Sequence, residues 1–200
     1  MAEPPANDVL AALEPVVDVL DSLGVRYRVG GSVASSALGV PRSTLDVDLA
    51  CELRLRHVAS FATQLIDTYY VDQDMIRDAI QRQSCCNLIH LATMLKVDLF
   101  IRRDRPFEDS AFERTVRRPL DPAPGAREFD LTTAEDIVLH KLEWFRAGGE
   151  VSERQWRDAV GVLAIQRDEI DRTYLQRWAI ELGISDLLAR AFALAEPASR

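Results

Sequence analysis

Three aspartates stand in two short apolar segments and could together bind a metal ion. Asp46 and Asp48 lie in the segment 45–50, where polar and apolar residues alternate, and Asp98 lies in the similar segment 95–101. On a β-strand, residues two apart point to the same face and lie roughly 7 Å apart. Both carboxylates are therefore expected on the face opposite the apolar one. Carboxylate oxygens are the ligands that Mg²⁺ prefers, and this ion keeps water positions open for phosphate oxygens.

If the two segments are neighbouring strands, Asp98 joins Asp46 and Asp48 on one sheet face. Three carboxylates at one place repel each other strongly unless a cation binds. One metal ion, or two about 4 Å apart, would remove this repulsion and position the attacking and leaving oxygens of a phosphate reaction. The alternative interpretation of each segment is a half-exposed strand whose polar side faces water.

A second candidate site is the turn Gly30-Gly31-Ser32, which separates an expected strand from an expected helix. Glycine allows a phosphate to approach the backbone closely. The following helix offers free N–H groups and the positive end of its dipole to an anion, and Ser32 can add a hydroxyl. The alternative is an ordinary turn in which Ser32 caps the helix.

Lys141 is the third candidate, because only two of the 24 basic residues are lysines, Lys96 and Lys141. A buried ammonium costs several kcal/mol unless it is paired, so a phosphate or a nearby Asp is the expected partner, and we predict a catalytic role. The alternative is a buried stem that carries its amine into water. The helical neighbours of Lys141 at three and four residues are all apolar: Ile137, Val138, Trp144 and Phe145.

The elements that would position these residues follow from hydrophobic periodicity and from Gly and Pro signals. The segment 117–127 holds three prolines and a glycine and is the expected linker. The pattern predicts helices over 10–20, 33–38 and 58–65 and strands over 25–29, 45–50, 88–91 and 95–101.

After residue 127 the pattern becomes helical. Thr132 with Glu135, and Ser152 with Gln155, fit capping boxes at the starts of two helices. Two further amphipathic helices are expected around 175–179 and 184–194. The predicted fold class is α+β, a small mixed sheet flanked by helices with a C-terminal helical bundle. The predicted domains are a core over 1–118 and a helical subdomain over 129–200.

Composition narrows the function classes. With 200 residues and a net charge of −8, the chain is long enough for a core and carries no general basic face for nucleic acid. The three cysteines are Cys51, Cys85 and Cys86, an odd number without metal-type spacing, so a reducing cytoplasm is expected. No apolar run approaches the ~20 residues that span a bilayer, and no membrane association is expected.

The combination of these motifs resembles the nucleotidyltransferase superfamily of DNA polymerase β type. Residues 29–50, VGGSVASSALGVPRSTLDVDLA, carry the resemblance. Residues 42–48 are particularly similar to the minimal bacterial nucleotidyltransferases, including the abortive-infection toxins of type IV toxin–antitoxin systems. The helical part looks like theirs in TTAEDIVLHKLEWFRAGG (132–149) and RQWRDAVGVL (154–163).

The resemblance implies a role for each matching residue. Asp46, Asp48 and Asp98 would hold Mg²⁺ or Mn²⁺, with Asp98 also taking the proton of the acceptor. The reaction would be in-line attack of an acceptor hydroxyl on the α-phosphate of an NTP, such as ATP, with release of pyrophosphate. The residues implied in nucleotide binding are Gly30, Gly31, Ser32, Arg42 and Thr44.

Two other functions remain open. An Asp-x-Asp pair also holds nucleotide sugars in glycosyltransferases, although their usual sheet needs longer parallel units than this chain supplies. A non-enzymatic module could keep the same fold to bind a nucleotide or to serve as one half of a toxin–antitoxin pair, with an antitoxin protein as partner. The acceptor is expected to be a protein, a tRNA or a small molecule.

Overall fold

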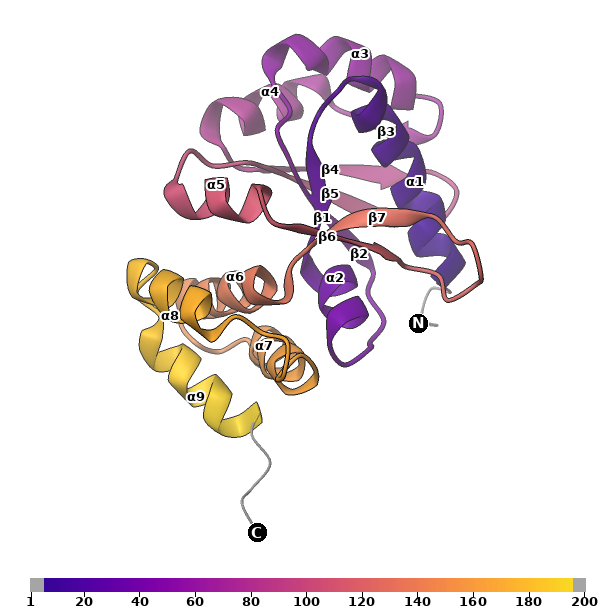
Figure 1. The fold of residues 1–200 in the computed structure, drawn as a ribbon. Coiled ribbons are helices and arrows are strands. Elements are labelled where there is room, and N and C mark those ends of the chain that lie inside the picture. The colour runs from indigo at the N-terminus through magenta and orange to yellow at the C-terminus, as the bar shows by residue number, and fades with distance from the viewer. Residues whose placement is uncertain (1–5, 196–200) are drawn as a thin grey trace. The chain divides into compact units, whose positions relative to one another are not determined.

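A computed structural model describes residues 6–195, and these form two compact units. The first unit holds the described residues up to Val33 together with Ser43–Leu131. The second unit holds Ala34–Arg42 and the described residues from Thr132 onward. Figure 1 shows the β-sheet of the first unit and the helices α6–α9 of the second. The predicted division into domains over 1–118 and 129–200 stays a prediction.

Within residues 6–195, seven strands form one mixed sheet in the order β3-β4-β5-β2-β1-β7-β6. β2 lies between β1, which runs antiparallel to it, and β5, which runs parallel to it. The strands are β1 (Tyr27–Val29), β2 (Asp46–Cys51), β3 (Tyr69–Tyr70), β4 (Cys85–His90), β5 (Lys96–Ile101), β6 (Thr115–Pro119) and β7 (Glu128–Thr132).

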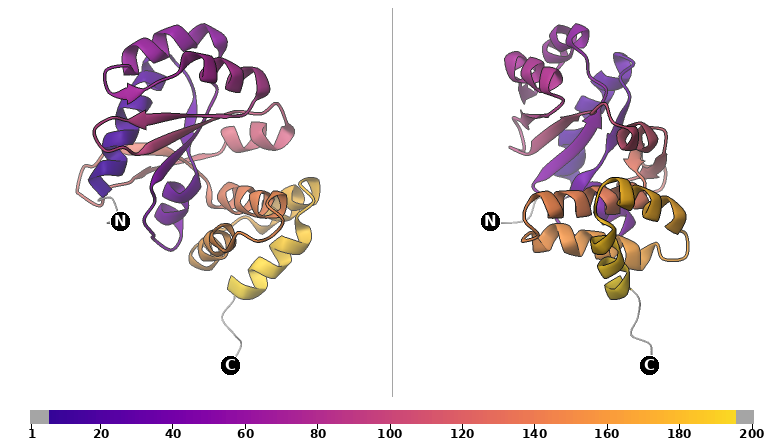
Figure 2. Two further views of the ribbon diagram at one scale, coloured as in Figure 1. Left: turned by 180° about the vertical axis from the view of Figure 1, so that it is seen from behind. Right: turned by 90° about the vertical axis from the view of Figure 1, so that its left-hand side faces the viewer.

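Three helices cover the apolar face of the sheet, as Figure 2 shows. They pack on a core whose central side chains include Val47 and Leu49 of β2, both fully buried. A short 3₁₀ turn, η1 (Leu55–His57), leads directly into the helix that begins at Val58. The three helices are α1 (Ala6–Ser22), α3 (Val58–Leu65) and α4 (Gln73–Arg82).

The second unit is helical, and side-chain caps define where its helices begin. Ser152 accepts a hydrogen bond from the backbone N–H of Gln155, so the predicted cap at Ser152 is confirmed. The predicted cap at Thr132 is wrong, because Thr132 ends β7 and Thr133 caps the helix by accepting from the N–H of Asp136. The helices are α6 (Ala134–Ala147), α7 (Glu153–Ile165), α8 (Arg172–Glu181) and α9 (Ser185–Ala195).

The predicted fold class, a mixed sheet with flanking helices and a C-terminal helical bundle, is confirmed. The segment 117–127, the expected linker, contains the end of β6 and the loop to β7 of the same sheet. Helix α4, which buries Ile76 and Ala79, was not predicted. Across the described part of the chain, no helix combines the length and apolar character that a bilayer crossing requires.

A buried ion pair joins the sheet to helix α5 (Pro106–Phe112). A guanidinium nitrogen of Arg28 lies 2.8 Å from a carboxylate oxygen of Glu108, and these side chains are only 2% and 9% exposed. The guanidinium also lies 4.6 Å from the centre of the Phe112 ring. The other oxygen of Glu108 accepts a hydrogen bond from Arg105 at 2.8 Å. One carboxylate therefore compensates two cations and fixes α5 on the sheet.

We expect Glu108→Gln to lower the free energy of unfolding by about 3 kcal/mol or more, because it leaves the Arg28 charge buried without its counter-ion. The matched control is Asp78→Asn, which breaks the exposed pair of Asp78 with Arg82 and should cost less than about 1 kcal/mol. Urea unfolding of both variants measures the difference, and equal costs would contradict the structural role of the pair.

Candidate active site

The predicted carboxylates lie on one face of the sheet, on two adjacent strands. Along β2, Asp46 and Asp48 are partly exposed, whereas Val47 and Leu49 are buried. β5 runs parallel to β2, and Asp98 is the direct neighbour of Asp48 across the pair. The expectation that the two segments are neighbouring strands is therefore confirmed. Their roles as metal ligands stay a prediction.

Asp46 is oriented by Thr44. The Thr44 hydroxyl lies 2.6 Å from Oδ1 of Asp46 and 3.1 Å from the Asp46 carbonyl oxygen. A hydroxyl has one proton to donate, and the shorter of its two contacts is the one to Oδ1. This contact restrains the Asp46 carboxylate at the start of β2. Thr44, predicted to bind nucleotide, is thus in contact with a predicted metal ligand in this structure.

Asp98 is held by Lys96, a residue that the motif did not include. The Lys96 ammonium lies 2.8 Å from Oδ2 of Asp98, and Lys96 is the neighbour of Asp46 across the β2–β5 pair. The hydrogen bond to Asp98 raises the pKa of Lys96, and the charges of Asp98 and Asp46 add to this effect against the cost of burial. Lys96 therefore remains cationic. It contributes positive charge to the carboxylate face, which is the side of β2 and β5 that carries Asp46, Asp48 and Asp98.

The glycine turn abuts the same carboxylates. Gly30 donates its N–H to the Asp48 carbonyl oxygen at 2.8 Å, and helix α2 (Gly31–Leu38) begins at the next residue. Gly31 has φ +54°, and a Cβ on it would overlap the carboxylate of Asp48. Gly31 is thus required both by its left-handed backbone and by the close approach of Asp48. Ser32 follows in the first turn of α2 and is buried.

These residues fit a magnesium site built on two carboxylates. Mg²⁺ in nucleotide enzymes is usually held by one or two carboxylates, with phosphate oxygens and water completing its shell. Asp46 and Asp48 supply two such groups at alternate positions of β2. Among residues 6–195, no three His, Cys, Asp or Glu side chains are arranged to share one metal ion.

Two further residues on the carboxylate face had no sequence signal. Asn87 of β4 is the neighbour of Asp98 on the other side of β5, and Cys85 is the neighbour of Phe100. Burial raises the pKa of the Cys85 thiol to about 12, with Asp98 as the next contribution. All three cysteines are free.

In the second unit, Lys141 and Arg42 share one carboxylate. The Lys141 ammonium lies 2.8 Å from Oδ2 of Asp158, and these side chains are 7% and 6% exposed. Arg42 binds the same carboxylate with two nitrogens, each at 2.8 Å. Lys141 therefore pairs with a nearby Asp and does not carry its amine into water. The nucleotide-binding role of Arg42 and the catalytic role of Lys141 stay predictions.

Asp158 is the residue that sequence reasoning missed as a partner. Burial alone would raise its pKa, but hydrogen bonds from Arg42 and Lys141 outweigh burial and hold the pKa of Asp158 below its ordinary value. The signal was present in the motif at 154–158, which ends in this aspartate. The motif could not show that the partners of Asp158 are Arg42 and Lys141, which lie 116 and 17 residues away in the chain.

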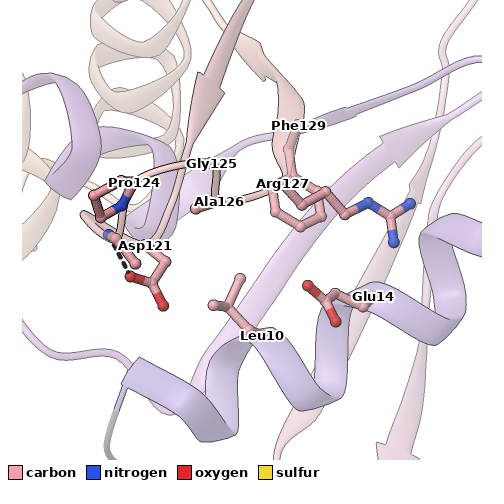
Figure 3. Close-up of a pocket in the computed structure, with 9 residues that line it drawn as sticks. Leu10, Glu14, Asp121, Pro124, Gly125, Ala126, Arg127 and Phe129 are labelled. Atoms are coloured by element: carbon pink, nitrogen blue, oxygen red, sulfur yellow. Dashed lines mark hydrogen bonds between the residues drawn. The ribbon is translucent and has the colours of Figure 1, made fainter.

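A cavity of about 280 Å³ lies elsewhere in the first unit, between α1 and the loop before β7. Figure 3 shows Leu10 and Glu14 of α1 on one side and Asp121 and Arg127 among the loop residues. Arg127 forms an ion pair with Asp18 at 2.7 Å. None of the predicted site residues lines this cavity. The candidate site is therefore not this cavity but the carboxylate face of β2 and β5.

Comparisons with known proteins give the fold. No family model and no curated protein matches the sequence. A nucleotidyltransferase-like protein from Paracoccidioides brasiliensis aligns over 96% of this chain and 95% of its own, with a TM-score of 0.57 and 16% identity. The chain has a nucleotidyltransferase fold. The antibiotic-resistance factor ANT(2'')-Ia aligns over 95% of this chain and 96% of its own, with a TM-score of 0.56 and 12% identity.

The predicted nucleotidyltransferase fold is confirmed, and the similarity to the abortive-infection toxins stays a prediction. The turn and the carboxylate face belong to the first unit, and the Arg42–Asp158–Lys141 cluster belongs to the second. Sequence motifs had identified members of both groups. The pairings of Asp98 with Lys96 and of Lys141 with Asp158 come from the structure alone.

We expect Gly31→Ala to destabilise the nucleotidyltransferase fold more than Gly24→Ala does. Both glycines have a positive φ, but a Cβ at Gly24 meets nothing within 4 Å, whereas a Cβ at Gly31 overlaps Asp48. The left-handed backbone alone costs Ala roughly 1–2 kcal/mol, and overpacking at Gly31 adds about 1–3 kcal/mol. Urea unfolding measures both variants. Equal losses would show that the contact with Asp48 is unimportant.

The Arg42–Asp158–Lys141 cluster predicts an acid-sensitive contribution to stability. Because the pKa of Asp158 is lowered in the folded chain, its contribution is complete above the ordinary aspartate pKa and is lost as pH falls through the lower folded value. We expect the stability difference between wild type and Asp158→Asn to be largest near neutral pH and to shrink below about pH 4. Urea unfolding between pH 7 and 3 tests this, and a constant difference would contradict it.

Proposed function

We propose that this protein is a metal-dependent nucleotidyltransferase that moves an NMP from an NTP to an acceptor hydroxyl. The observation that carries the proposal is the junction of the Gly30–Ser32 turn with the carboxylates of β2 and β5. The Gly30 N–H donates to the Asp48 carbonyl, and Asp98 neighbours Asp48 in the adjacent strand. A phosphate-binding turn beside paired carboxylates is suited to a reaction at a nucleotide phosphate.

The turn offers the elements of a triphosphate site. The first N–H groups of α2 and the positive end of its dipole attract the β- and γ-phosphates. Gly31 lacks a side chain, so the Asp48 carboxylate lies against the turn, and an ion held by Asp48 would lie beside phosphates bound there. Ser32 would add a hydroxyl donor, and Ser32→Ala probes this contact without the backbone strain that any substitution of Gly31 brings.

Asp46 and Asp48 would hold Mg²⁺ or Mn²⁺, with Asp98 as a further ligand. A bound ion at this position supplies neutralisation of phosphate charge and orientation of the phosphate oxygens. The Thr44 hydroxyl, at 2.6 Å from Oδ1 of Asp46, keeps that carboxylate in one orientation. A carboxylate that is already restrained requires less ordering when an ion binds, which favours affinity.

The reaction is an in-line displacement at the α-phosphorus. The acceptor hydroxyl oxygen forms a bond to the α-phosphorus, and the bond from this phosphorus to the bridging α–β oxygen breaks, so pyrophosphate leaves. The acceptor proton goes to a carboxylate oxygen of Asp98, the proposed general base. Positioning and charge neutralisation supply most of the rate enhancement in such reactions.

The remaining predicted residues enter the proposal as cations and as a positioning group. The predicted nucleotide-binding role of Arg42 and the predicted catalytic role of Lys141 belong to the second unit, where both cations bind Asp158 at 2.8 Å. Thr44 would act chiefly through Asp46. For the acceptor, an antibiotic-resistance factor shares the fold, which keeps a small molecule beside proteins and tRNA among the candidates.

The test is transfer of label from each of the four α-labelled NTPs, with Mg²⁺ and cell extract as the source of acceptors. We expect wild type to label an acceptor and release pyrophosphate with at least one NTP. Asp48→Asn should lower the rate about a hundred- to a thousandfold, because it removes a proposed ligand of the ion whose positive charge would stabilise the transition state. Asp78→Asn removes an equal charge at an exposed position on α4 and should transfer label normally.

Two outcomes would contradict the proposal: no transfer from any NTP, or equal rates for Asp48→Asn and wild type. Nucleotide binding without transfer would instead favour the non-enzymatic module. Calorimetry with a non-hydrolysable NTP distinguishes these cases, because it detects binding whether or not transfer occurs.

A further inference from the structure

Lys96 brings a positive charge into the row of carboxylates on β2 and β5. Its ammonium lies 2.8 Å from Oδ2 of Asp98, and its backbone position neighbours Asp46. Across the strand pair, Asp46 therefore stands beside a cation, and Asp48 stands beside Asp98, the anion that this cation holds. Three carboxylates and one ammonium give this group a formal charge of −2 in place of −3.

The residue type supports a specific use of the ammonium. Arginine supplies 22 of the 24 basic residues of the chain, so lysine at position 96 departs from the general preference. An ammonium is a compact charge on a flexible stem, whereas a guanidinium spreads its charge over a planar fork. The Lys96 side chain is 45% exposed and Asp98 is 12% exposed. The cation therefore has room to leave, while the carboxylate stays fixed in β5.

We propose that Lys96 is the internal counter-ion of the carboxylate face and competes with a divalent cation for Asp98. In the nucleotide-free protein the ammonium occupies Oδ2 of Asp98, so an incoming ion meets Asp46 and Asp48 and is repelled by Lys96. The inference rests on the proposed function, because it concerns the same carboxylates. Lys96 is a positioning residue in this scheme, since it acts through Asp98.

Two possible roles of Lys96 predict opposite changes in metal affinity when the lysine is removed. A lysine that merely orients Asp98 as a ligand would favour metal binding, and its loss would weaken affinity. A lysine that competes for Asp98 opposes metal binding, and its loss would strengthen affinity. The repulsion between a unit charge and a divalent ion a few ångströms away is large at a protein surface, and solvent screening at a half-exposed side chain reduces it. We therefore expect about a tenfold change.

The test is titration of the nucleotide-free full chain with Mn²⁺. Binding is measured by isothermal calorimetry and by the electron paramagnetic resonance signal of free Mn²⁺. Lys96→Met keeps an apolar stem, removes the charge and should lower the Kd for Mn²⁺ about tenfold. Lys96→Arg keeps a positive charge but spreads it over a planar fork, so its Kd should lie between the values of wild type and Lys96→Met. The double variant Lys96→Met/Asp98→Asn should lose most of the gain, because Asp98 is the carboxylate that the first change releases.

The matched control is Arg77→Met. It removes one positive charge from the same unit by breaking the surface pair of Arg77 with Asp74, and its Kd should stay within about twofold of wild type. Thermal unfolding confirms that each variant is folded. Binding by Lys96→Met where wild type shows none supports the inference.

An unchanged or weaker affinity in Lys96→Met overturns the inference, as does absence of Mn²⁺ binding in both proteins. The label-transfer assay decides the proposed function separately. If wild type transfers label while Lys96→Met binds Mn²⁺ no more tightly, the proposed function stands and the role of Lys96 falls.

Discussion

Repulsion between like charges on two adjacent strands is the constraint on which the first unit depends. The parallel register of β2 and β5 puts Asp48 beside Asp98, with Asp46 two residues away on the same face. Carboxylates this close favour a cation among them, and in this structure the cation is the Lys96 ammonium at 2.8 Å from Asp98. The apolar side of the same strands, with Val47 and Leu49 fully buried, keeps the register from slipping.

The second unit shows the opposite arrangement of charge. There one buried carboxylate, Asp158, binds two cations, Lys141 and Arg42, at 2.8 Å. Burial disfavours an ionised carboxylate, but two hydrogen-bonded cations overcome this cost and keep Asp158 ionised. The pairing also fixes the two cations in one geometry.

Sequence reasoning found the parts of the candidate site that follow from local spacing. Alternation on β2 predicted that Asp46 and Asp48 share a face, and the glycines at 30–31 predicted a turn into a helix. It missed Asn87, the neighbour of Asp98, because a single polar residue in a strand has no distinguishing pattern. It also placed a linker at 117–127, since prolines mark an irregular segment but do not reveal that the strands on both sides join one sheet.

The sequence by itself determined the residue types, the faces they occupy and the fold class, because periodicity and turn chemistry act over a few residues. The tertiary structure decided which charges meet. Asp98 is 50 residues from Asp48, and Asp158 is 116 residues from Arg42, so their encounters depend on strand order and helix packing. It also decided that Gly31 is required by the Asp48 carboxylate lying against it, a contact between elements that spacing along the chain cannot express.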